Sequence, residues 1–304
     1  MPLAIRFLAA LAFLVLGLAP AAAAETRFAL VVGNSAYATA GRLPNAGNDA
    51  RLVAAAFEAM GFEVAALYDL DEAAMGKALD DLAKKAGTLD VAAVYFAGHG
   101  IQKDGRNFLI PVDASLRSPT AVERETIALD SLMEALEQVP ISLVFLDACR
   151  NNPFAEALME DTSAGGRTAN VKRGLAVVRT KGDMLVTFAT LPNSVASDGA
   201  EGNSPFARAL ARHIKTPDTE VSVLMKRVTR DVMDETRGEQ RPQQLSQMQT
   251  EFYFKKTSAA PTVDTEAKTL LAVYPGKVKT GEEISVLADV PHSCSPSFLN
   301  LTPS

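Results

Sequence analysis

One histidine and one cysteine end two apolar segments of the chain, and their residue types are those of a base and a nucleophile. The segments are YFAGHG (residues 95–100) and FLDACR (residues 145–150), in a chain with three histidines and two cysteines. A thiol with a pKa of about 8.5 is mostly protonated at neutral pH, so it needs a base, and an imidazole can accept its proton and return it to a leaving group. The pair predicts a cysteine hydrolase with His99 as base and Cys149 as nucleophile.

Glycines flank this histidine on both sides. Without side chains at Gly98 and Gly100, the Gly100 N–H can approach a substrate carbonyl and form an oxyanion hole with the Cys149 N–H. The plainer alternatives are a hydrogen-bonded turn histidine, an inert core cysteine, and a disulfide between Cys149 and Cys294. A zinc site is disfavoured, because no second His or Cys lies near either residue in the sequence. We therefore expect no metal and no cofactor.

The elements that must position this pair alternate along the chain. Between Arg27 and about Phe254, apolar runs of strand length alternate with segments of helical period, which predicts βαβ units on a parallel sheet. The predicted strands are continuous apolar runs, as expected for strands covered on both faces: 28–32, 63–68, 91–96, 141–146 and 184–190. His99 and Cys149 follow the third and fourth strands, at the carboxyl edge where such sheets bind ligands.

Residues that cap helices, together with the helix-breaking residues Gly and Pro, predict where the helices begin and end. We expect a helix capped by Asn48 or Asp49 and stopped by Gly61, and others over 71–87, 130–140, 205–214 and 221–235. Asp104-Gly105 predicts a tight hairpin directly after the histidine motif, which would form one wall of a cleft.

The two motifs resemble those of the bacterial caspase-like peptidases in the caspase, metacaspase and paracaspase superfamily. Caspases also have their histidine about fifty residues before the cysteine. Further matching segments are VGNSAY (32–37), LPNAGNDA (43–50), ASDG (196–199) and NSPF (203–206), so the resemblance covers residues 26 to about 254. It implies an α/β fold: a caspase-like three-layer sandwich with a mostly parallel central sheet.

The resemblance also implies roles for particular residues. It makes His99 and Cys149 a catalytic dyad, and it places Asp49 and Asp147 in the primary specificity pocket. Two carboxylates there would select Arg or Lys before the scissile bond. The structural alternative makes Asp49 a plain helix cap and bonds Asp147 to the backbone.

The chain also departs from the family pattern. The sequence around the cysteine, DACRN (147–151), lacks the Gln-Ala-Cys signature of caspases, so aspartate specificity is not expected. No acid-rich insertion of the kind that binds calcium in many metacaspases follows His99, which puts calcium dependence in doubt.

Residues 155–182 hold five basic residues and weak periodicity, which predicts a long mobile loop after the cysteine. Because the pocket is expected to accept basic residues, this loop is a candidate for self-cleavage after Lys172 or Arg173.

The two ends of the chain predict export and an extra module. Arg6, an apolar run over 7–19 and small residues before Glu25 predict a signal peptide over 1–24, the alternative being an uncleaved membrane anchor. The peptidase domain would then span 25–256 in a periplasmic or secreted protein. A linker is expected over 257–269, and a partial β-rich module over 270–304.

The sequence as a whole predicts an exported cysteine endopeptidase that forms a thioester acyl-enzyme and cuts peptides or proteins after Arg or Lys. The rivals are a transpeptidase of related fold and a non-catalytic interaction module. With 48% hydrophobic residues the chain can build a sizeable core. Its net charge of −6 and scattered basic residues argue against a nucleic-acid partner. No membrane association is expected after signal cleavage, and the oligomeric state is left open.

Overall fold

The computed structural model describes residues 25–39, 41–149, 171–172, 182–191, 196–197, 199 and 202–257, with backbone only at Cys149, Val171 and Lys172. The chain divides into two compact units, Met1–Thr257 and Ser258–Ser304, and all of the described residues lie in the first. The expected signal peptide and C-terminal module, and the expected linker beyond Thr257, lie outside the described residues. No helix among the described residues is long and apolar enough to span a membrane.

Strands and helices alternate along the described chain, as the apolar runs predict. The strands are β1 (Arg27–Gly33), β2 (Glu63–Tyr68), β3 (Val91–Lys103), β4 (Arg106–Leu109), β5 (Ile127–Ala128), β6 (Ile141–Cys149), β7 (Val171–Lys172), β8 (Asp183–Phe188) and β9 (Gln243–Ser246). The helices are α2 (Ala46–Glu58), α3 (Glu72–Ala86), α4 (Ala121–Arg124), α5 (Leu129–Ala135), α7 (Pro205–His213) and α8 (Val221–Glu235).

The central sheet has the strand order β2-β1-β3-β6-β8-β9. Every neighbouring pair in this order is parallel except β8 and β9, so β9 is an antiparallel edge strand. The middle strands are buried on both faces, which explains why they read as continuous apolar runs rather than as alternating ones.

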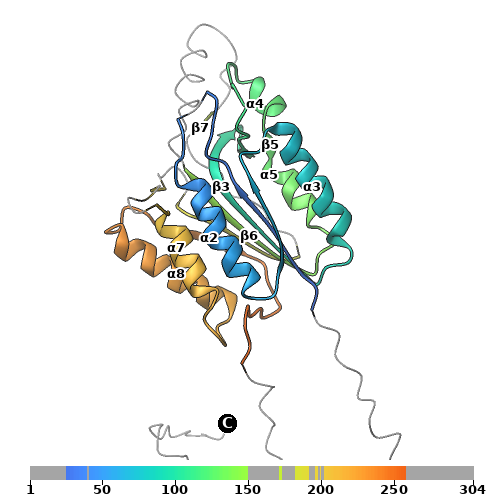
Figure 1. Cartoon of the computed structure of the whole chain (residues 1–304), viewed down its shortest axis with the longest axis vertical. Coiled ribbons are helices and arrows are strands. Elements are labelled where there is room, and N and C mark those ends of the chain that lie inside the picture. Colours follow the sequence, from blue (N-terminus) through green and yellow to red (C-terminus); the bar gives the residue numbers. More distant parts are fainter. Residues whose placement is uncertain are drawn as a thin grey trace, which may run out of the picture. The chain divides into compact units, whose positions relative to one another are not determined.

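Helices cover both faces of the sheet. Figure 1 shows α2, α7 and α8 on one side and α3 and α5 on the other. Successive residues of β3 divide between the two cores: Ala93 and Tyr95 pack with the α2 side, whereas Val94 and Phe96 pack with the α3 side. The predicted three-layer α/β sandwich is therefore confirmed.

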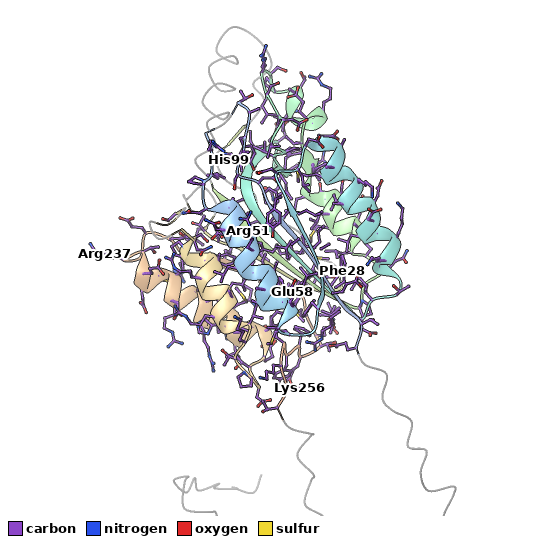
Figure 2. All side chains as sticks on the ribbon, viewed as in Figure 1. Phe28, Arg51, Glu58, His99, Arg237 and Lys256 are labelled. Atoms are coloured by element: carbon purple, nitrogen blue, oxygen red, sulfur yellow. The ribbon has the colours of Figure 1, made fainter. Side chains whose placement is uncertain are left out.

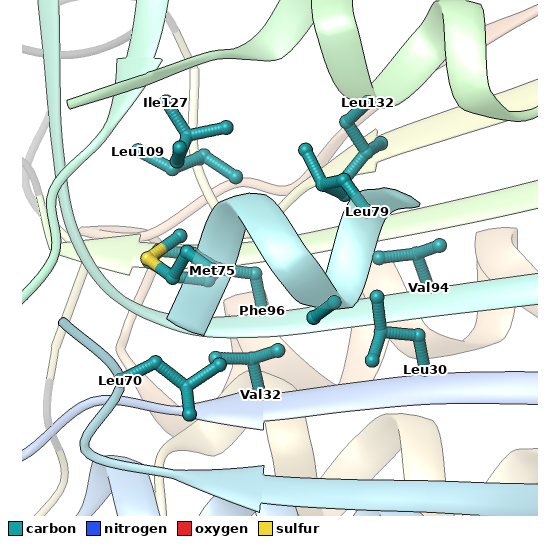
Figure 3. A pocket seen from close by; sticks show the side chains of 11 residues that line it. Leu30, Val32, Leu70, Met75, Leu79, Val94, Phe96, Leu109, Ile127 and Leu132 are labelled. Atoms are coloured by element: carbon teal, nitrogen blue, oxygen red, sulfur yellow. The ribbon is translucent and has the colours of Figure 1, made fainter. Parts of the chain in front are cut away.

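The core under α3 contains one small apolar cavity of about 20 Å³ (Figure 3). Its lining includes Leu30 and Val32 of β1, Met75 of α3 and Phe96 of β3. A space of this size would hold about one water molecule, but its lining is apolar, so it is expected to stay dry. It is a packing gap of the core.

Most predicted helix boundaries are confirmed, with two corrections. The helix predicted over 130–140 ends earlier, because α5 spans Leu129–Ala135. Asp71 caps α3 by accepting from the Ala74 N–H (2.8 Å), and Pro205 opens α7. The prediction that Asn48 or Asp49 caps the first helix is wrong, because α2 begins three residues earlier with Asn45 as its N-cap. The Asn45 side chain donates instead to the Gly199 carbonyl (2.9 Å), so a tertiary contact holds this helix start.

The predicted hairpin after the histidine motif is confirmed. Asp104 and Gly105 have φ of +51° and +79°, and Lys103 pairs with Arg106 across the turn. Two positive φ values are typical of the tight turn that suits the twist of a hairpin. Because β3 continues to Lys103, its outer end leaves the parallel sheet and pairs with β4.

Candidate active site

The register of β3 and β6 brings the predicted base and nucleophile together. His99 lies directly opposite Cys149, at the last pair of this parallel ladder, and neighbouring strands are about 4.8 Å apart. Figure 2 shows His99 at the opposite end of the sheet from Phe28, which lies near the start of β1. The pair therefore occupies the carboxyl edge of the sheet.

The His99 imidazole is buried, at 3% exposure, and held in one orientation. Its Nε2 lies 2.9 Å from the Gly41 carbonyl oxygen. Because a carbonyl only accepts hydrogen bonds, Nε2 must carry the ring proton, which makes Nδ1 an acceptor. Nδ1 is buried and has no hydrogen-bond partner among the described residues. The ring thus presents an available lone pair, which a base requires.

Burial also sets the basicity of this ring. Desolvation lowers the pKa of His99 below its ordinary value of 6.5, and the hydrogen bond to Gly41 opposes that shift in part. The lowered pKa keeps the imidazole neutral at neutral pH, so it can accept a proton.

Tyr37 packs against His99 in two ways. The Tyr37 hydroxyl accepts from the His99 N–H (2.7 Å), and the two ring centroids are 4.4 Å apart. A Cβ at position 98 would lie 2.6 Å from the Tyr37 hydroxyl oxygen. Glycine at position 98 therefore leaves room for Tyr37, a reason for this residue that is distinct from the predicted substrate approach.

The Gly100 N–H points away from β4. The Ile110 N–H donates to the His99 carbonyl (3.0 Å), which makes Gly100 and Leu109 a pair that is not hydrogen-bonded. The Gly100 N–H is therefore directed toward the opposite edge of β3, where β6 ends at Cys149.

The two predicted pocket carboxylates, Asp49 and Asp147, meet at one serine. Asp49 Oδ1 accepts from the Ser204 N–H and from Asn203 Nδ2, both at 2.8 Å. Asp147 Oδ2 accepts from the Ser204 hydroxyl and from the Tyr95 hydroxyl (2.9 Å). Asp49 and Asp147 are 2% and 7% exposed, so both carboxylates are buried.

These contacts differ from the purely structural roles considered above, in which Asp49 is a helix cap and Asp147 is bonded to the backbone. Asp49 lies in the first turn of α2, after the cap, and its carboxylate binds a different segment of the chain. Asp147 is bonded to two side-chain hydroxyls. The structure therefore makes them a tertiary cluster that joins α2, β6 and the start of α7.

Several residues of this site were not predicted. Tyr37, Gly41, Tyr95, Asn203 and Ser204 complete the contacts of His99, Asp49 and Asp147. Tyr37 and the Asn203-Ser204 pair lie in segments that carry the family resemblance, which was the available signal. Gly41 binds His99 through its backbone carbonyl, and a contact made by the backbone cannot be predicted from the type of residue.

The candidate self-cleavage residue Lys172 lies in a short strand. Lys172 pairs with Gln102 and Val171 pairs with Lys103 in antiparallel fashion, whereas Arg173 lies outside the described residues. Gln102 is three residues beyond His99 in β3, a distance of about 10 Å along a strand. The Lys172 peptide bond is therefore away from His99 while β7 is paired.

Over the described ranges, no three His, Cys, Asp or Glu side chains lie together in a group that could hold a metal ion.

Comparison with known proteins identifies this architecture. The caspase domain family matches residues 26–254. Mucosa-associated lymphoid tissue lymphoma translocation protein 1 from Homo sapiens is 24% identical over 175 residues, which are 57% of this chain and 21% of that protein. The Mus musculus homologue gives the same values. The chain thus spans about a fifth of the length of these curated relatives.

Among solved structures, caspase-1 from Spodoptera frugiperda superposes with a TM-score of 0.54 at 16% identity. The match covers 78% of this chain and 92% of that chain. At this identity the likeness concerns the fold alone.

We predict that Ser204→Ala lowers the free energy of unfolding by about 2–4 kcal/mol, because it removes the α7 cap and a hydroxyl donor to buried Asp147. Urea unfolding followed by circular dichroism measures this. The matched control is Asp71→Ala, which removes only the α3 cap and should cost about 1 kcal/mol. An equal loss in the two variants would show that the Ser204–Asp147 contact contributes nothing.

Proposed function

Because the chain belongs to the caspase domain family, we propose that it is a cysteine endopeptidase with His99 as its base and Cys149 as its nucleophile. Family membership supports a cysteine-peptidase function in general. The observation that carries the finer proposal is the strand register that pairs His99 with Cys149 at the carboxyl edge. The buried imidazole, with its protonated Nε2 on Gly41 and its acceptor Nδ1, supports the role of base.

The reaction then proceeds in two halves. His99 Nδ1 takes the Cys149 thiol proton, and the thiolate attacks the scissile carbonyl carbon to form a tetrahedral intermediate. As this collapses, the peptide C–N bond breaks and the leaving amine takes the proton from His99, which leaves a thioester on Cys149. His99 next removes a proton from water, which attacks the thioester and releases the acid and the thiol.

The negative charge that develops on the substrate oxygen in the tetrahedral intermediate must be stabilised by hydrogen-bond donors. The Gly100 and Cys149 N–H groups are the proposed oxyanion hole, worth about 10²–10³ in rate per donor in other enzymes. Cys149 belongs to the last pair of the β3–β6 ladder, and Gly100 directly follows His99, the other member of that pair. Oxyanion binding therefore requires this last pair to open when a substrate enters.

We further propose that Asp49 and Asp147 hold an Arg or Lys side chain before the cleaved bond. Two observations support this role for the carboxylates. Ser204 binds both of them, and Asp147 lies two residues before the proposed nucleophile. A guanidinium or ammonium would donate charge-assisted hydrogen bonds to these oxygens. The Ser204, Asn203 and Tyr95 donors would hold the carboxylates in place before the substrate arrives.

Loss of either member of the pair should abolish turnover. Cys149→Ala and His99→Gln should each lower kcat/KM for Arg peptides by at least about 10²-fold. The control His213→Gln, at a histidine that hydrogen-bonds to Asp231 of α8, should not. Fluorogenic peptides with Arg, Lys, Asp or Ala before the bond provide the assay. Hydrolysis that persists in Cys149→Ala would overturn the proposal, and product masses would separate hydrolysis from transpeptidation.

Burial of the His99 imidazole should affect the pH dependence of Cys149 alkylation. Since desolvation lowers the pKa of His99 below 6.5, the neutral base persists to lower pH than for an exposed histidine. In a Cys294→Ala background, the acid limb for alkylation of Cys149 by iodoacetamide should have its midpoint below 6.5. A midpoint above 7 would contradict the role of His99.

The pocket proposal predicts a selective loss. Asp49→Asn or Asp147→Asn keeps the shape but removes a charge, and losing a charged partner in a desolvated pocket costs about 2–5 kcal/mol. Turnover of Arg peptides should therefore fall by about 30-fold or more. Labelling of Cys149 by iodoacetamide should hardly change. The control is Asp81→Asn on the exposed face of α3. An intact preference for Arg and Lys in folded variants would refute the pocket.

Self-cleavage is a further expected outcome. Since Lys172 lies opposite Gln102 in β7, cutting after Lys172 or Arg173 requires β7 to leave β3 or to enter the site of another molecule. Gels should show two fragments for wild type and none for Cys149→Ala, and mass spectrometry should place the cut. Fragments of equal yield in both proteins would indicate an outside protease.

A further inference from the structure

We propose that Tyr37 is a positioning residue for His99, whose hydroxyl is inserted into the β3–β4 ladder and fixes the imidazole at the nucleophile. The inference rests on the proposed function, in which His99 is the base. It concerns a residue that lies 62 positions before the histidine and does not follow from the motif itself.

The hydroxyl replaces one hydrogen bond of the ladder. In an antiparallel sheet, two residues of a hydrogen-bonded pair exchange both of their N–H···O bonds. Here the Ile110 N–H donates to the His99 carbonyl (3.0 Å), but the return bond runs through Tyr37. The His99 N–H donates to the Tyr37 oxygen (2.7 Å), and the Tyr37 hydroxyl donates to the Ile110 carbonyl (3.1 Å). The backbone position of His99 therefore depends on one side-chain oxygen.

The same loop also fixes the ring. Tyr37 and Gly41 both follow β1, and the Gly41 carbonyl accepts from the His99 ring at Nε2 (2.9 Å). The Tyr37 ring lies against the imidazole with centroids 4.4 Å apart and an angle of 53°. One segment thus controls the backbone, the tilt and the tautomer of the proposed base.

This loop is itself anchored on either side of Tyr37. The Asp69 carboxylate accepts from the Ser35 and Ala36 N–H groups (2.7 and 2.8 Å), and the Ala38 N–H donates to the Val112 carbonyl (2.8 Å). Tyr37 is also buried, at 5% exposure. The Tyr37 hydroxyl is therefore held in place between the His99 N–H and the Ile110 carbonyl.

Removal of the Tyr37 hydroxyl can have two structural outcomes, and both disturb His99. Either the His99 N–H and the Ile110 carbonyl stay apart in a buried place, or β3 and β4 close the space and carry His99 with them. The second outcome moves the base by about the width of one atom, and a displacement near 1 Å can lower a catalytic rate by about 10²-fold.

The test compares Tyr37→Phe with two controls in the full chain. Tyr253→Phe makes the same chemical change at an exposed hydroxyl that donates to Glu251. Val228→Ala removes core packing in α8, which supplies none of the described contacts of His99. With Arg peptides, Tyr37→Phe should lower kcat by about 10–100-fold and change KM by less than about 2-fold. Both controls should keep the wild-type kcat at a temperature where all variants are folded.

A second measurement does not use activity. In protein labelled with ¹⁵N-histidine and carrying Cys149→Ala, the His99 signals, assigned by their loss in His99→Gln, should report the Nε2–H tautomer. Adding Tyr37→Phe should mix the tautomers and move the His99 pKa toward 6.5, because a displaced ring loses its contact with the Gly41 carbonyl and becomes accessible to solvent. Tyr253→Phe should leave the spectrum unchanged.

The outcomes separate this inference from the proposed function. An unchanged His99 tautomer in Tyr37→Phe, or a kcat loss no larger than that of Val228→Ala, overturns the role of Tyr37. Hydrolysis that survives Cys149→Ala instead overturns the proposed function, and the spectrum still tests whether Tyr37 fixes His99.

Discussion

The register between β3 and β6 is the constraint on which the rest of the site depends. Side chains alternate between the two faces of a strand, so a slip of one residue would move His99 to the other face of the sheet. The buried apolar side chains of both strands oppose such a slip, since the α2 core and the α3 core each take alternate residues. The buried Tyr95–Asp147 hydrogen bond adds a polar contact between the same two strands near the carboxyl edge. Register, and with it the His99–Cys149 pairing, is thus set by packing before any substrate is present.

Around this ladder, buried polar groups bind one another rather than solvent. The loop after β1 supplies Tyr37 and Gly41 to His99, and the start of α7 supplies Ser204 to both carboxylates. Inside a protein such contacts are strong when complete and costly when broken, because the low dielectric that strengthens them also penalises an unpaired group. The residues proposed for specificity therefore also hold α2, β6 and α7 together. A change at Ser204 must act on stability and on the pocket at once.

The sequence was informative where burial determines the pattern and uninformative where tertiary contacts do. The strands β1 and β2 and the helix α8 were predicted closely, because long apolar or periodic segments mark them. Strand β6, predicted over 141–146, continues to Cys149, so the proposed nucleophile lies in the strand and not after it. Strand β9 was missed, since its sequence, Gln-Gln-Leu-Ser, carries no apolar run and pairs at a sheet edge. The strand predicted over 91–96 continues to Lys103, because Gly98 and Gly100 sit in extended backbone instead of ending it. The dyad candidates followed from residue chemistry, but the Tyr37 hydroxyl and the Gly41 carbonyl depend on contacts between distant segments.

The position of Asp49 places its buried carboxylate among groups that favour negative charge. It lies in the first turn of α2, where unsatisfied N–H groups and the helix dipole favour negative charge. The Ser204 N–H and the Asn203 amide add two donors from outside the helix. These four features stabilise the anion without a substrate, so the proposed pocket would be organised before binding. A substrate cation would then meet oxygens that are already oriented, which lowers the ordering cost of binding and leaves selection to charge and shape.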